Sequence, residues 1–464
     1  TQYYCPFNGV LTTMPALKSL FEATSVAIVG ASDDPHKIGG RPIAYMKRLK
    51  YKGQLIPINP KNDTIQGLPA KRSLLELDAP VDLAVVAVPD AFVEKVIQEG
   101  LQLGIKNFVV FASGYAEINQ QGIDKQAKLK ALFDGTDARL LGPNCLGFIN
   151  TETQLVASFT TAMEQHPLKV GGLSFAGHSG ALGAYWLDKT IRADIGVSKW
   201  VSSGNEANLS LDEIVAYLAT DSQTTVISLY IEEIRHPEKF EKALKLARKN
   251  NKPVIALKGG KTAAGARATA AHTASYPLKG VDYQAIFKRT GVIEVHSLSE
   301  MIHCSQFFLG GHKLLGNKVG IISISGGAGV MLCDQLEEHG LTIEPFSHPL
   351  HDKIKPLLSD FSTVQNPVDL TAALVAQPNM LRDTTRQLVD SNEFNVVVIF
   401  MGLMDSVAQQ LTNGLLKLKN NPACPVLVIW MGGQAALLAD IAKKGMLVFE
   451  EIPDLVTLLS NVKP

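Results

Sequence analysis

Short apolar stretches of strand length alternate with longer amphipathic stretches along most of the chain. A first series of strands is predicted at residues 25–30, 54–58, 83–88 and 107–111. A second series is predicted at 172–175, 225–231 and 253–258, and a third at 318–323, 395–401 and 425–430. Because buried strands that alternate with helices are typical of parallel sheets covered on both faces, the pattern predicts an α/β fold.

The opening strand of each series runs into a turn rich in glycine and serine. The three turns read GASDDPHKIGG, SFAGHSGALG and SISGGAGV. Three restarts of one pattern predict three consecutive doubly wound domains, at residues 1–150, 151–312 and 313–464. The recurrence is one of architecture, because the three stretches share no detectable sequence repeat.

Charge and cysteine content exclude several classes of function. The 44 acidic and 44 basic residues balance, so no net charge favours nucleic acid or an anionic membrane. No apolar run reaches the roughly 18 to 20 residues that a membrane-spanning helix needs. The five cysteines are widely spaced, with no CxxC or Cys/His pair at metal spacing, which favours reduced thiols. We therefore expect a cytoplasmic protein without a metal site that contacts neither nucleic acid nor membrane.

The first turn carries Gly30, Ser32, Lys37 and Arg41 directly after a predicted strand. Exposed backbone amides at such a turn bind anions, and lysine and arginine side chains add positive charge. The turn has one glycine where the NAD fingerprint needs several, so an NAD(P)-dependent oxidoreductase is disfavoured. A tight turn that binds no ligand remains the alternative for this segment taken alone.

Polar residues also follow the next strands of the first series. Asn59 and Lys61 come after the second strand and Ser113 after the fourth. Ligands of doubly wound sheets bind at the carboxyl ends of the strands, where these residues gather. The pattern therefore predicts a nucleotide-like ligand whose phosphates meet Lys37 and Lys61.

The second turn places Ser179 where it caps a helix that continues through Gly180. The free amides of the first helical turn would form a site for a phosphate. An ordinary serine cap without a ligand is the alternative. The third turn, around Ser325, could bind an anion in the same way, but no Lys-Ser/Thr pair follows, so it is not a P-loop.

Residues 259–273 consist almost entirely of small side chains and end near His272. Because such a run cannot anchor itself by burial, we expect a loop or a closely packed backbone there. A neutral histidine can attack a phosphoryl group if an acceptor holds its other ring nitrogen, and Glu232 at a strand end could be that acceptor. A solvated or structural histidine is the alternative.

Eight short motifs together resemble one family. In order, they are VGASDDPHKIGGRP, INPKNDTIQG, VPDA, ASGYAE, LGPNCLGFIN, HSGALG, ALKGGKTAAGARATAAHT and NPVDL. Each motif is weak alone, but their order is that of the NDP-forming acyl-CoA synthetases, which include the α subunit of ADP-forming acetyl-CoA synthetase and, more distantly, that of succinyl-CoA synthetase. The resemblance runs from about Leu20 to the end of the chain.

The resemblance implies a Rossmann-like CoA-binding domain, then a flavodoxin-like domain that carries a phosphohistidine, then a second flavodoxin-like domain. His272 matches the phosphorylated histidine, and Glu232 matches the carboxylate that orients it. Ser179, Gly180 and the neighbouring His178 correspond to the phosphate cradle, and Pro143 and Asn144 to the segment by the acyl phosphate. The positions that match CoA contacts are Gly30, Ser32, Lys37, Asn59, Lys61 and Ser113.

The same resemblance implies the reaction and its partners. ATP phosphorylates His272, the phosphate passes to a small carboxylic acid, and CoA displaces it to give acyl-CoA, ADP and phosphate. Nothing in the chain resembles the ATP-grasp domain that holds ATP/ADP and Mg²⁺, so we expect that domain as a β subunit or a fused domain, in a hetero- or homo-oligomer. A non-catalytic CoA-binding module is the alternative, but such modules commonly lack the histidine that His272 supplies.

The chain departs from the family at two places. His178 stands where the family usually has a glutamine beside the phosphate. Ala271, Ala274 and Leu278 replace residues of the SHTG segment and of a following AG. These departures favour a larger or unusual acid, such as an aryl or sulfur-containing one.

Overall fold

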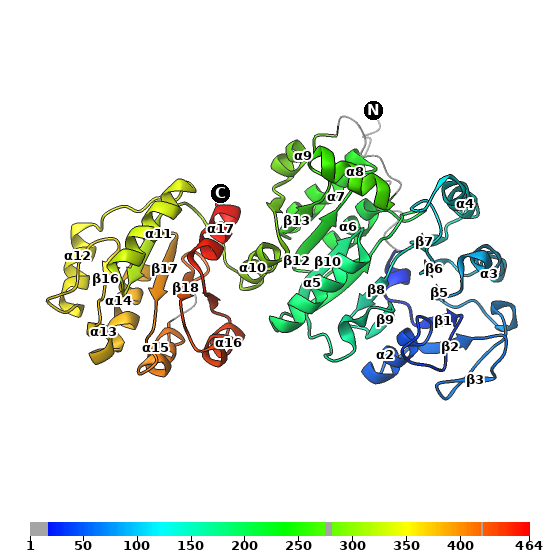
Figure 1. The fold of residues 1–464 in the computed structure, drawn as a ribbon, viewed down its shortest axis with the longest axis horizontal. Helices are drawn as coiled ribbons and strands as arrows, with labels where there is room; N and C mark the ends of the chain where they lie inside the picture. Colours follow the sequence, from blue (N-terminus) through cyan, green and yellow to red (C-terminus); the bar gives the residue numbers. More distant parts are fainter. Residues whose placement is uncertain (1–16, 274–280, 419–420) are drawn as a thin grey trace, which may run out of the picture. The chain divides into compact units, whose positions relative to one another are not determined.

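The structure, a computed structural model, describes residues 17–273, 281–418 and 421–464, with the backbone alone at residues 271–273 (Figure 1). The chain divides into two compact units, and the division in the sequence falls between Met301 and Ile302. The first unit holds two large sheets and the second holds one. None of the helices in the described part of the chain combines the length and the apolar character needed to cross a membrane.

The first sheet has five parallel strands, and its central strands are buried because helices flank them. Their order is β2 (Gln54–Ile58), β1 (Ser25–Val29), β5 (Leu83–Val86), β6 (Asn107–Val110) and β7 (Arg139–Leu141). The connecting elements are α2 (Arg41–Leu49), the hairpin β3 (Thr64–Ile65) and β4 (Leu68–Pro69), the 3₁₀ turn η1 (Leu74–Glu76), α3 (Asp90–Leu103) and α4 (Gln120–Ala131).

The second sheet has seven strands. Their order is β14 (Ile293–Val295), β13 (Val254–Lys258), β12 (Val226–Ile231), β10 (Val170–Gly177), β11 (Val197–Ser202), β8 (Gly147–Asn150) and β9 (Leu155–Ser158). The first five in this list are parallel, whereas β8 and β9 form an antiparallel edge. The helical elements are η2 (Thr161–Met163), α5 (Gly180–Arg192), α6 (Leu211–Thr220), α7 (Pro237–Lys249), α8 (Ala263–Thr273) and α9 (Tyr283–Thr290). The helix α10 (Leu298–Leu309) contains the division between the two units.

The third sheet has five parallel strands. Their order is β16 (Val368–Asp369), β15 (Val319–Ser323), β17 (Val396–Met401), β18 (Val426–Trp430) and β19 (Leu447–Phe449). Its helical elements are α11 (Gly326–Glu338), α12 (His348–Ile354), η3 (Lys355–Leu357), α13 (Ala373–Ala376), α14 (Asn379–Asp390), α15 (Ala408–Leu415), α16 (Ala435–Lys443) and α17 (Ile452–Val462).

All three sheets share one strand order. When only the parallel crossover strands of each sheet are numbered along the chain, each sheet reads 2-1-3-4-5, which is the flavodoxin-like order. The α/β class and the doubly wound architecture predicted from the sequence are confirmed. The domain boundaries stay a prediction, and the structure adds that β8 pairs into the second sheet although its residues precede position 151.

The start of the described chain packs against the second sheet. The carbonyl oxygen of Phe21 accepts a hydrogen bond of 2.9 Å from the Asn150 side chain. The Phe21 ring lies 5.0 Å from that of Phe148 and 4.9 Å from that of Tyr217, measured between centroids. These contacts tie the first sheet to the second within the first unit.

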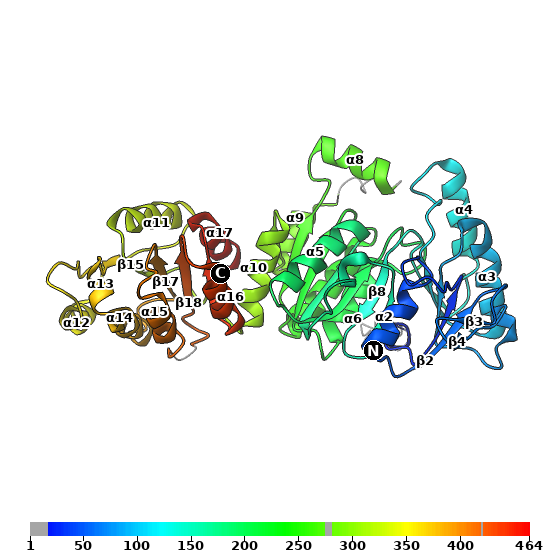
Figure 2. The same ribbon diagram turned by 60° about the horizontal axis from the view of Figure 1, so that its bottom comes forward.

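The expectation of a loop or a closely packed backbone at residues 259–273 was wrong for residues 263–273. The backbone from Ala263 to Thr273 is the helix α8, which stands off from the helices that cover the second sheet (Figure 2). Alanine has the highest intrinsic helix propensity, so an alanine-rich stretch forms a helix without burying large side chains. Small side chains therefore indicated weak packing correctly but not the absence of regular structure.

Candidate functional site

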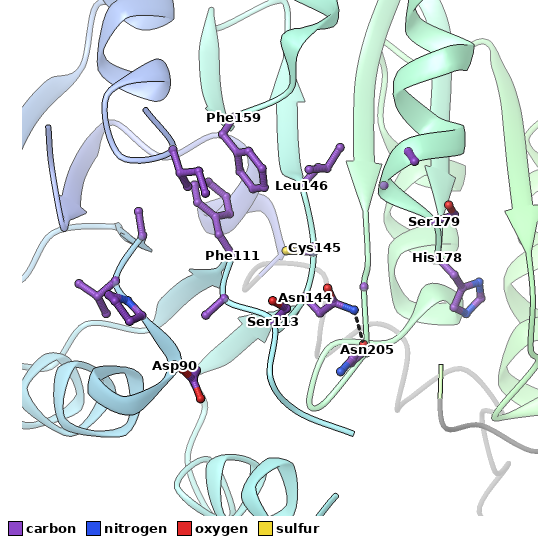
Figure 3. A pocket seen from close by; sticks show the side chains of 18 residues that line it. Asp90, Phe111, Ser113, Asn144, Cys145, Leu146, Phe159, His178, Ser179 and Asn205 are labelled. Carbon is purple, nitrogen blue, oxygen red and sulfur yellow. Dashed lines mark hydrogen bonds between the residues drawn. The ribbon is translucent and has the colours of Figure 1, made fainter. Parts of the chain in front are cut away.

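A cavity of about 580 Å³ opens where strand ends of the first and second sheets face each other (Figure 3). Segments that follow β5, β6 and β7 line one side of it, and segments that follow β10 and β11 line the other. Since ligands of doubly wound sheets bind at the carboxyl ends of strands, two such binding edges share this space.

One part of the cavity wall is apolar. The rings of Phe111 and Phe159 lie 4.8 Å apart in an edge-to-face arrangement. Leu146 and Cys145 line the wall beside them, as Figure 3 shows. Burial raises the pKa of Cys145 to about 12, so its thiol stays protonated near neutral pH and acts as a small apolar side chain.

Two asparagines form the polar centre of the cavity. The side chain of Asn144 donates a 3.1 Å hydrogen bond to Asn205 Oδ1 (Figure 3). Asn205 in turn donates to Glu117 at 2.6 Å, and Glu117 also accepts from the amides of Gly114 and Tyr115. Asn144 is thus fixed in place by a chain of side chains that links the β6, β7 and β11 ends. Its φ of +54° shows that the backbone there is also held in the left-handed region.

The helix α5 begins at the cavity with Ser179 as its N-cap. Ser179 Oγ accepts a 3.3 Å hydrogen bond from the amide of Leu182, and the segment Ser179–Ala181 lines the cavity. A Cβ at Gly180 would lie 2.6 Å from Leu146 Cγ, so glycine allows these two segments to approach. The first amides of α5, with the positive end of the helix dipole, are available to an anion.

A buried histidine lies directly before this helix. His178 Nε2 is 3.0 Å from Glu206 Oε1, and the two side chains are 4% and 2% exposed. Burial by itself would lower the pKa of His178, but the carboxylates of Glu206 and Glu232 raise it above its ordinary value. Conversely, His178 and Arg235 outweigh burial and hold the pKa of Glu206 below its ordinary value. The pair therefore favours the charged form of both groups.

Glu232 follows β12 next to His178. Its backbone amide donates a 3.3 Å hydrogen bond to His178 Nδ1, and its backbone carbonyl accepts one of 2.9 Å from Lys258 Nζ. Burial, together with the Glu232 carboxylate, raises the pKa of the Tyr230 phenol. Burial lowers the pKa of Lys258, and Glu232 opposes that effect. Glu232 thus belongs to a buried group of titratable side chains around the β12 and β13 ends.

The first glycine-rich turn packs closely on the first sheet. Gly30 has a φ of +83°, and a Cβ there would lie 2.7 Å from the carbonyl oxygen of Ala87. Asn59 donates to the carbonyl of Ala31 at 2.8 Å and accepts from the amide of Lys61 at 2.8 Å. Asn59 therefore holds the turn.

The basic side chains beside this turn differ in whether they already form an ion pair within the protein. The side chains of Lys37 and Lys61 are exposed. Arg41, which was expected to add positive charge for an anion, instead pairs with Glu164, with Nη2 2.9 Å from Oε1. Ser32 Oγ accepts from the amide of Asp34 at 3.2 Å within the turn.

The structure brings some of the sequence-predicted site residues together and leaves others apart. Those that share the cavity are Ser113, Asn144, His178, Ser179 and Gly180. Pro143 precedes Asn144, and Glu232 contacts His178 from behind the wall. Gly30, Ser32, Lys37, Asn59 and Lys61 gather at the β1 and β2 ends but do not line the cavity.

His272 lies in the last turn of α8, and its side chain is outside the described residues. The same holds for Ala271, while Ala274 and Leu278 lie outside them altogether. Among the described residues, no group of three or more His, Cys, Asp or Glu side chains is arranged to hold a metal ion.

Asn205 and Glu206 are functional candidates that the sequence reasoning missed. They follow β11, a strand that was not predicted because Lys199 interrupts its apolar run. The signal that could have found them is the Ser-Gly-Asn-Glu stretch at residues 203–206, which resembles the other polar strand ends.

Two family models match this chain. A CoA binding domain matches residues 24–151, and a succinyl-CoA ligase like flavodoxin domain matches residues 170–308. These matches fall on the first and the second sheet.

Named relatives extend the similarity along the chain. The α subunit of ADP-forming acetate–CoA ligase II from Pyrococcus furiosus is 33% identical over 446 residues, which cover 94% of this chain and 95% of that subunit. The ADP-forming acetate–CoA ligase of Methanocaldococcus jannaschii is 35% identical over 355 residues, or 76% of this chain and 49% of the relative. The chain therefore matches about half the length of the latter protein.

A solved structure matches as well. It is the dinucleotide-forming acetyl-coenzyme A synthetase 1 of Candidatus Korarchaeum cryptofilum in complex with phosphate and ADP, with a TM-score of 0.87 and 26% identity over 96% of both chains. Fold and sequence similarity therefore cover the same, nearly complete, part of the chain.

Proposed function

We propose that this chain, which belongs to the family of ADP-forming acyl-CoA synthetases, is the part of such an enzyme that binds CoA and carries phosphate from the nucleotide to the acid. The overall reaction joins a carboxylic acid to CoA while ATP becomes ADP and phosphate. The chain is accordingly an acid–thiol ligase.

The shared cavity is the observation that carries this proposal. Ser113 from the CoA-binding side, Asn144 at the centre and the N-terminus of α5 all line one space. A reaction in which CoA attacks an acyl phosphate requires a thiol site and a phosphate site within reach of each other. In this proposal the first sheet provides the thiol site and the second sheet provides the phosphate site.

The first step proposed is phosphoryl transfer to His272. A ring nitrogen attacks the γ-phosphorus of ATP, the bond to the β,γ-bridging oxygen breaks, and ADP leaves. Glu232 accepts a hydrogen bond from the other ring nitrogen, which keeps its proton, and so stabilises the cationic phosphorylated ring. The burial of Glu232, at 5% exposure, supports this role because a carboxylate shielded from water interacts more strongly with a cationic ring.

The acid and CoA then complete the reaction. A carboxylate oxygen attacks the phosphorus of the phosphohistidine, which releases the histidine and forms an acyl phosphate. The CoA sulfur attacks the acyl carbon, and phosphate leaves. The free amides after Ser179 stabilise the phosphate group in both steps, and Asn144, held by Asn205, is positioned to hydrogen-bond the acyl group.

The proposed partners follow from this division of labour. ATP and Mg²⁺ are held by an ATP-grasp β subunit or fused domain, and Lys37 and Lys61 meet the phosphates of CoA. The apolar wall at Phe111 and Phe159 supports an acid with an apolar substituent, such as an aryl or sulfur-containing acid.

A labelling experiment tests the proposal. The chain is incubated with an ATP-grasp partner subunit, Mg²⁺ and ATP labelled at the γ-phosphate. The wild type should gain an acid-labile, base-stable phosphate, and His272→Ala should abolish both the label and acyl-CoA synthesis. CoA affinity, measured by calorimetry, should change little, because the CoA-binding turn lies in another domain.

His236→Ala is the matched control, since His236 belongs to the same domain but lies at the start of α7 with its side chain 47% exposed. That variant should keep the label. Label that persists in His272→Ala would assign the carrier role to another histidine. A wild-type chain that never takes up phosphate would overturn the proposal in favour of a CoA-binding module.

A further inference from the structure

Glu206 has no part in the proposed reaction, yet the fold holds it in an unusual way. It is buried at 6% exposure, and its φ of +52° lies in the left-handed region that residues with a side chain rarely adopt. Its carboxylate accepts from Ser203 Oγ at 2.8 Å and from the amide of Leu211 at 3.2 Å, besides facing His178. The loop after β11 therefore fixes one carboxylate against one imidazole.

His178 connects that carboxylate to Glu232. Its Nε2 faces Glu206, and its Nδ1 lies between two backbone groups of β12 and its end. One is the amide of Glu232, 3.3 Å away, which donates to Nδ1. The other is the carbonyl oxygen of Tyr230, 3.4 Å away, which can only accept.

The proton on Nδ1 decides which of these two contacts is made. When Nδ1 carries no proton, it accepts from the Glu232 amide. When it is protonated, it donates to the Tyr230 carbonyl and no longer accepts from Glu232. The ring also becomes a cation beside the Glu232 carboxylate, which it attracts.

We propose that Glu206 and His178 are positioning residues that link the proton on His178 Nδ1 to the orientation of Glu232 and so control its use as the partner of the phosphohistidine. This inference rests on the proposed function, because the role of Glu232 does. Neither residue touches the reacting atoms, since both ring nitrogens of His178 face protein groups.

The charges around His178 give the direction of the effect. Glu206 and Glu232 face it from the β11 and β12 ends, and Arg235 adds an opposing positive charge. Although burial lowers the pKa of His178, the carboxylates raise it above 6.5, so the ring gains its proton on the acid side of that raised value. As the pH rises through the His178 pKa, the ring loses its positive charge and no longer attracts the Glu232 carboxylate. Phosphorylation of His272 should therefore increase over this pH range.

Three variants test the link through the pH profile of label uptake. In Glu206→Gln the midpoint of this rise should fall by about one pH unit, because a charge that holds the proton is lost. Glu206→Asp retains that charge, so its midpoint should lie close to that of the wild type. His178→Gln introduces at position 178 the glutamine that is usual in the family. In this variant the pH profile of label uptake should show only the titration of His272 itself.

Asp212→Asn is the matched control. Asp212 Oδ1 lies 3.1 Å from His236 Nδ1, and neither residue lines the cavity. The substitution therefore removes a carboxylate from a different histidine–carboxylate pair of the same domain. This variant should leave the profile unchanged. A midpoint that stays in place in Glu206→Gln, or a profile in His178→Gln identical to that of the wild type, would overturn the inference.

Nuclear magnetic resonance tests the same link without activity. The chain is labelled on histidine rings and on glutamate amides, and the signals of His178 and Glu232 are followed with pH. Both should titrate with one midpoint in the wild type, and the Glu232 amide should stop titrating in His178→Gln. If the wild type takes up no phosphate but the two signals still titrate together, the proposed function fails while the positioning link stands. If they titrate independently, the link fails whatever the label shows.

Discussion

Two buried ion pairs lie on the second sheet, and they differ in what each can do. Lys199 Nζ in the middle of β11 is 2.8 Å from Asp221 Oδ2, and these side chains are 1% and 6% exposed. His178 and Glu206, at the strand ends, are as close and as buried. Burial and distance therefore do not separate the two pairs.

The identity of the cation separates them. Asp221 also accepts from Thr224, and although burial works the other way, the hydrogen bond from Lys199 holds the pKa of Asp221 below its ordinary value. Lysine as a residue type gives up its proton only in strongly basic solution, so a lysine–carboxylate pair is the kind that keeps both charges near neutral pH. Histidine titrates near neutrality, so the pair at the cavity can change its charge. The comparison teaches that a buried pair becomes a control element only when one member titrates near the working pH.

The largest effect is expected for the fixed pair. Lys199→Met leaves Asp221 as a buried charge without its cation and should lower the free energy of unfolding by about 3 to 5 kcal/mol. Urea denaturation of the chain, followed by circular dichroism, measures the loss. The double variant Lys199→Met/Asp221→Leu should recover most of it. A single variant as stable as the wild type would mean that this pair is not a structural anchor.

A smaller effect, which depends on pH, is expected for Glu206→Gln. The raised pKa of His178 means that its contribution to stability is complete below pH 6.5 and is lost as the pH rises through the folded value. The lowered pKa of Glu206 means that its contribution is present above pH 4.5 and is lost as the pH falls through the folded value.

The stability difference between wild type and Glu206→Gln should thus be widest between these two limits, at about 1.4 kcal/mol, which is the equivalent of the one-unit pKa change expected for this variant. Denaturation at a series of pH values checks it. A difference that does not change between pH 5 and pH 9 would contradict the assignment of His178 as the titrating member.

The smallest effect is expected for the pair of His236 and Asp212. The two side chains lie 3.1 Å apart, and Asp212 is 6% exposed, but the His236 side chain is 47% exposed. Because water screens the half-exposed imidazole, Asp212→Asn should cost less than about 1 kcal/mol. Thermal unfolding followed in parallel with Glu206→Gln provides the measurement, and a loss equal to that of Glu206→Gln would show that the exposure of the histidine does not set the ranking.

The sequence predicted the parts of the fold in which the apolar pattern is uninterrupted. The strands β1, β2, β12 and β17 lie within a residue or so of their predicted positions, because each is a nearly continuous run of apolar residues in the sequence. Ser179 was predicted as an N-cap, and its hydroxyl accepts from Leu182. A cap depends on neighbours in the sequence, so it can be predicted locally.

The parts that failed depend on tertiary contacts. The strand β11 was missed because Lys199 looks like an exposed residue, although Asp221 pairs with it inside the protein. The antiparallel β8 and β9 were missed since they join the second sheet only through pairing with β11. Glu206 is a charged residue in a glycine-containing turn, and only the approach of His178 from another strand reveals its burial. Sequence patterns report neighbours along the chain, whereas these residues are defined by neighbours across it.

The packing of Phe21 on the second sheet has a consequence for the time at which the protein is made. Its partner Tyr217 is 196 positions further along the chain, a separation given by 217 minus 21. At about 5 to 20 residues per second, a ribosome needs roughly 10 to 40 seconds to travel from one to the other. During synthesis, the first segment must therefore wait until 196 further residues have been added before the Phe21 ring can pack against Tyr217. That interval is when a nascent chain of this kind most needs a chaperone.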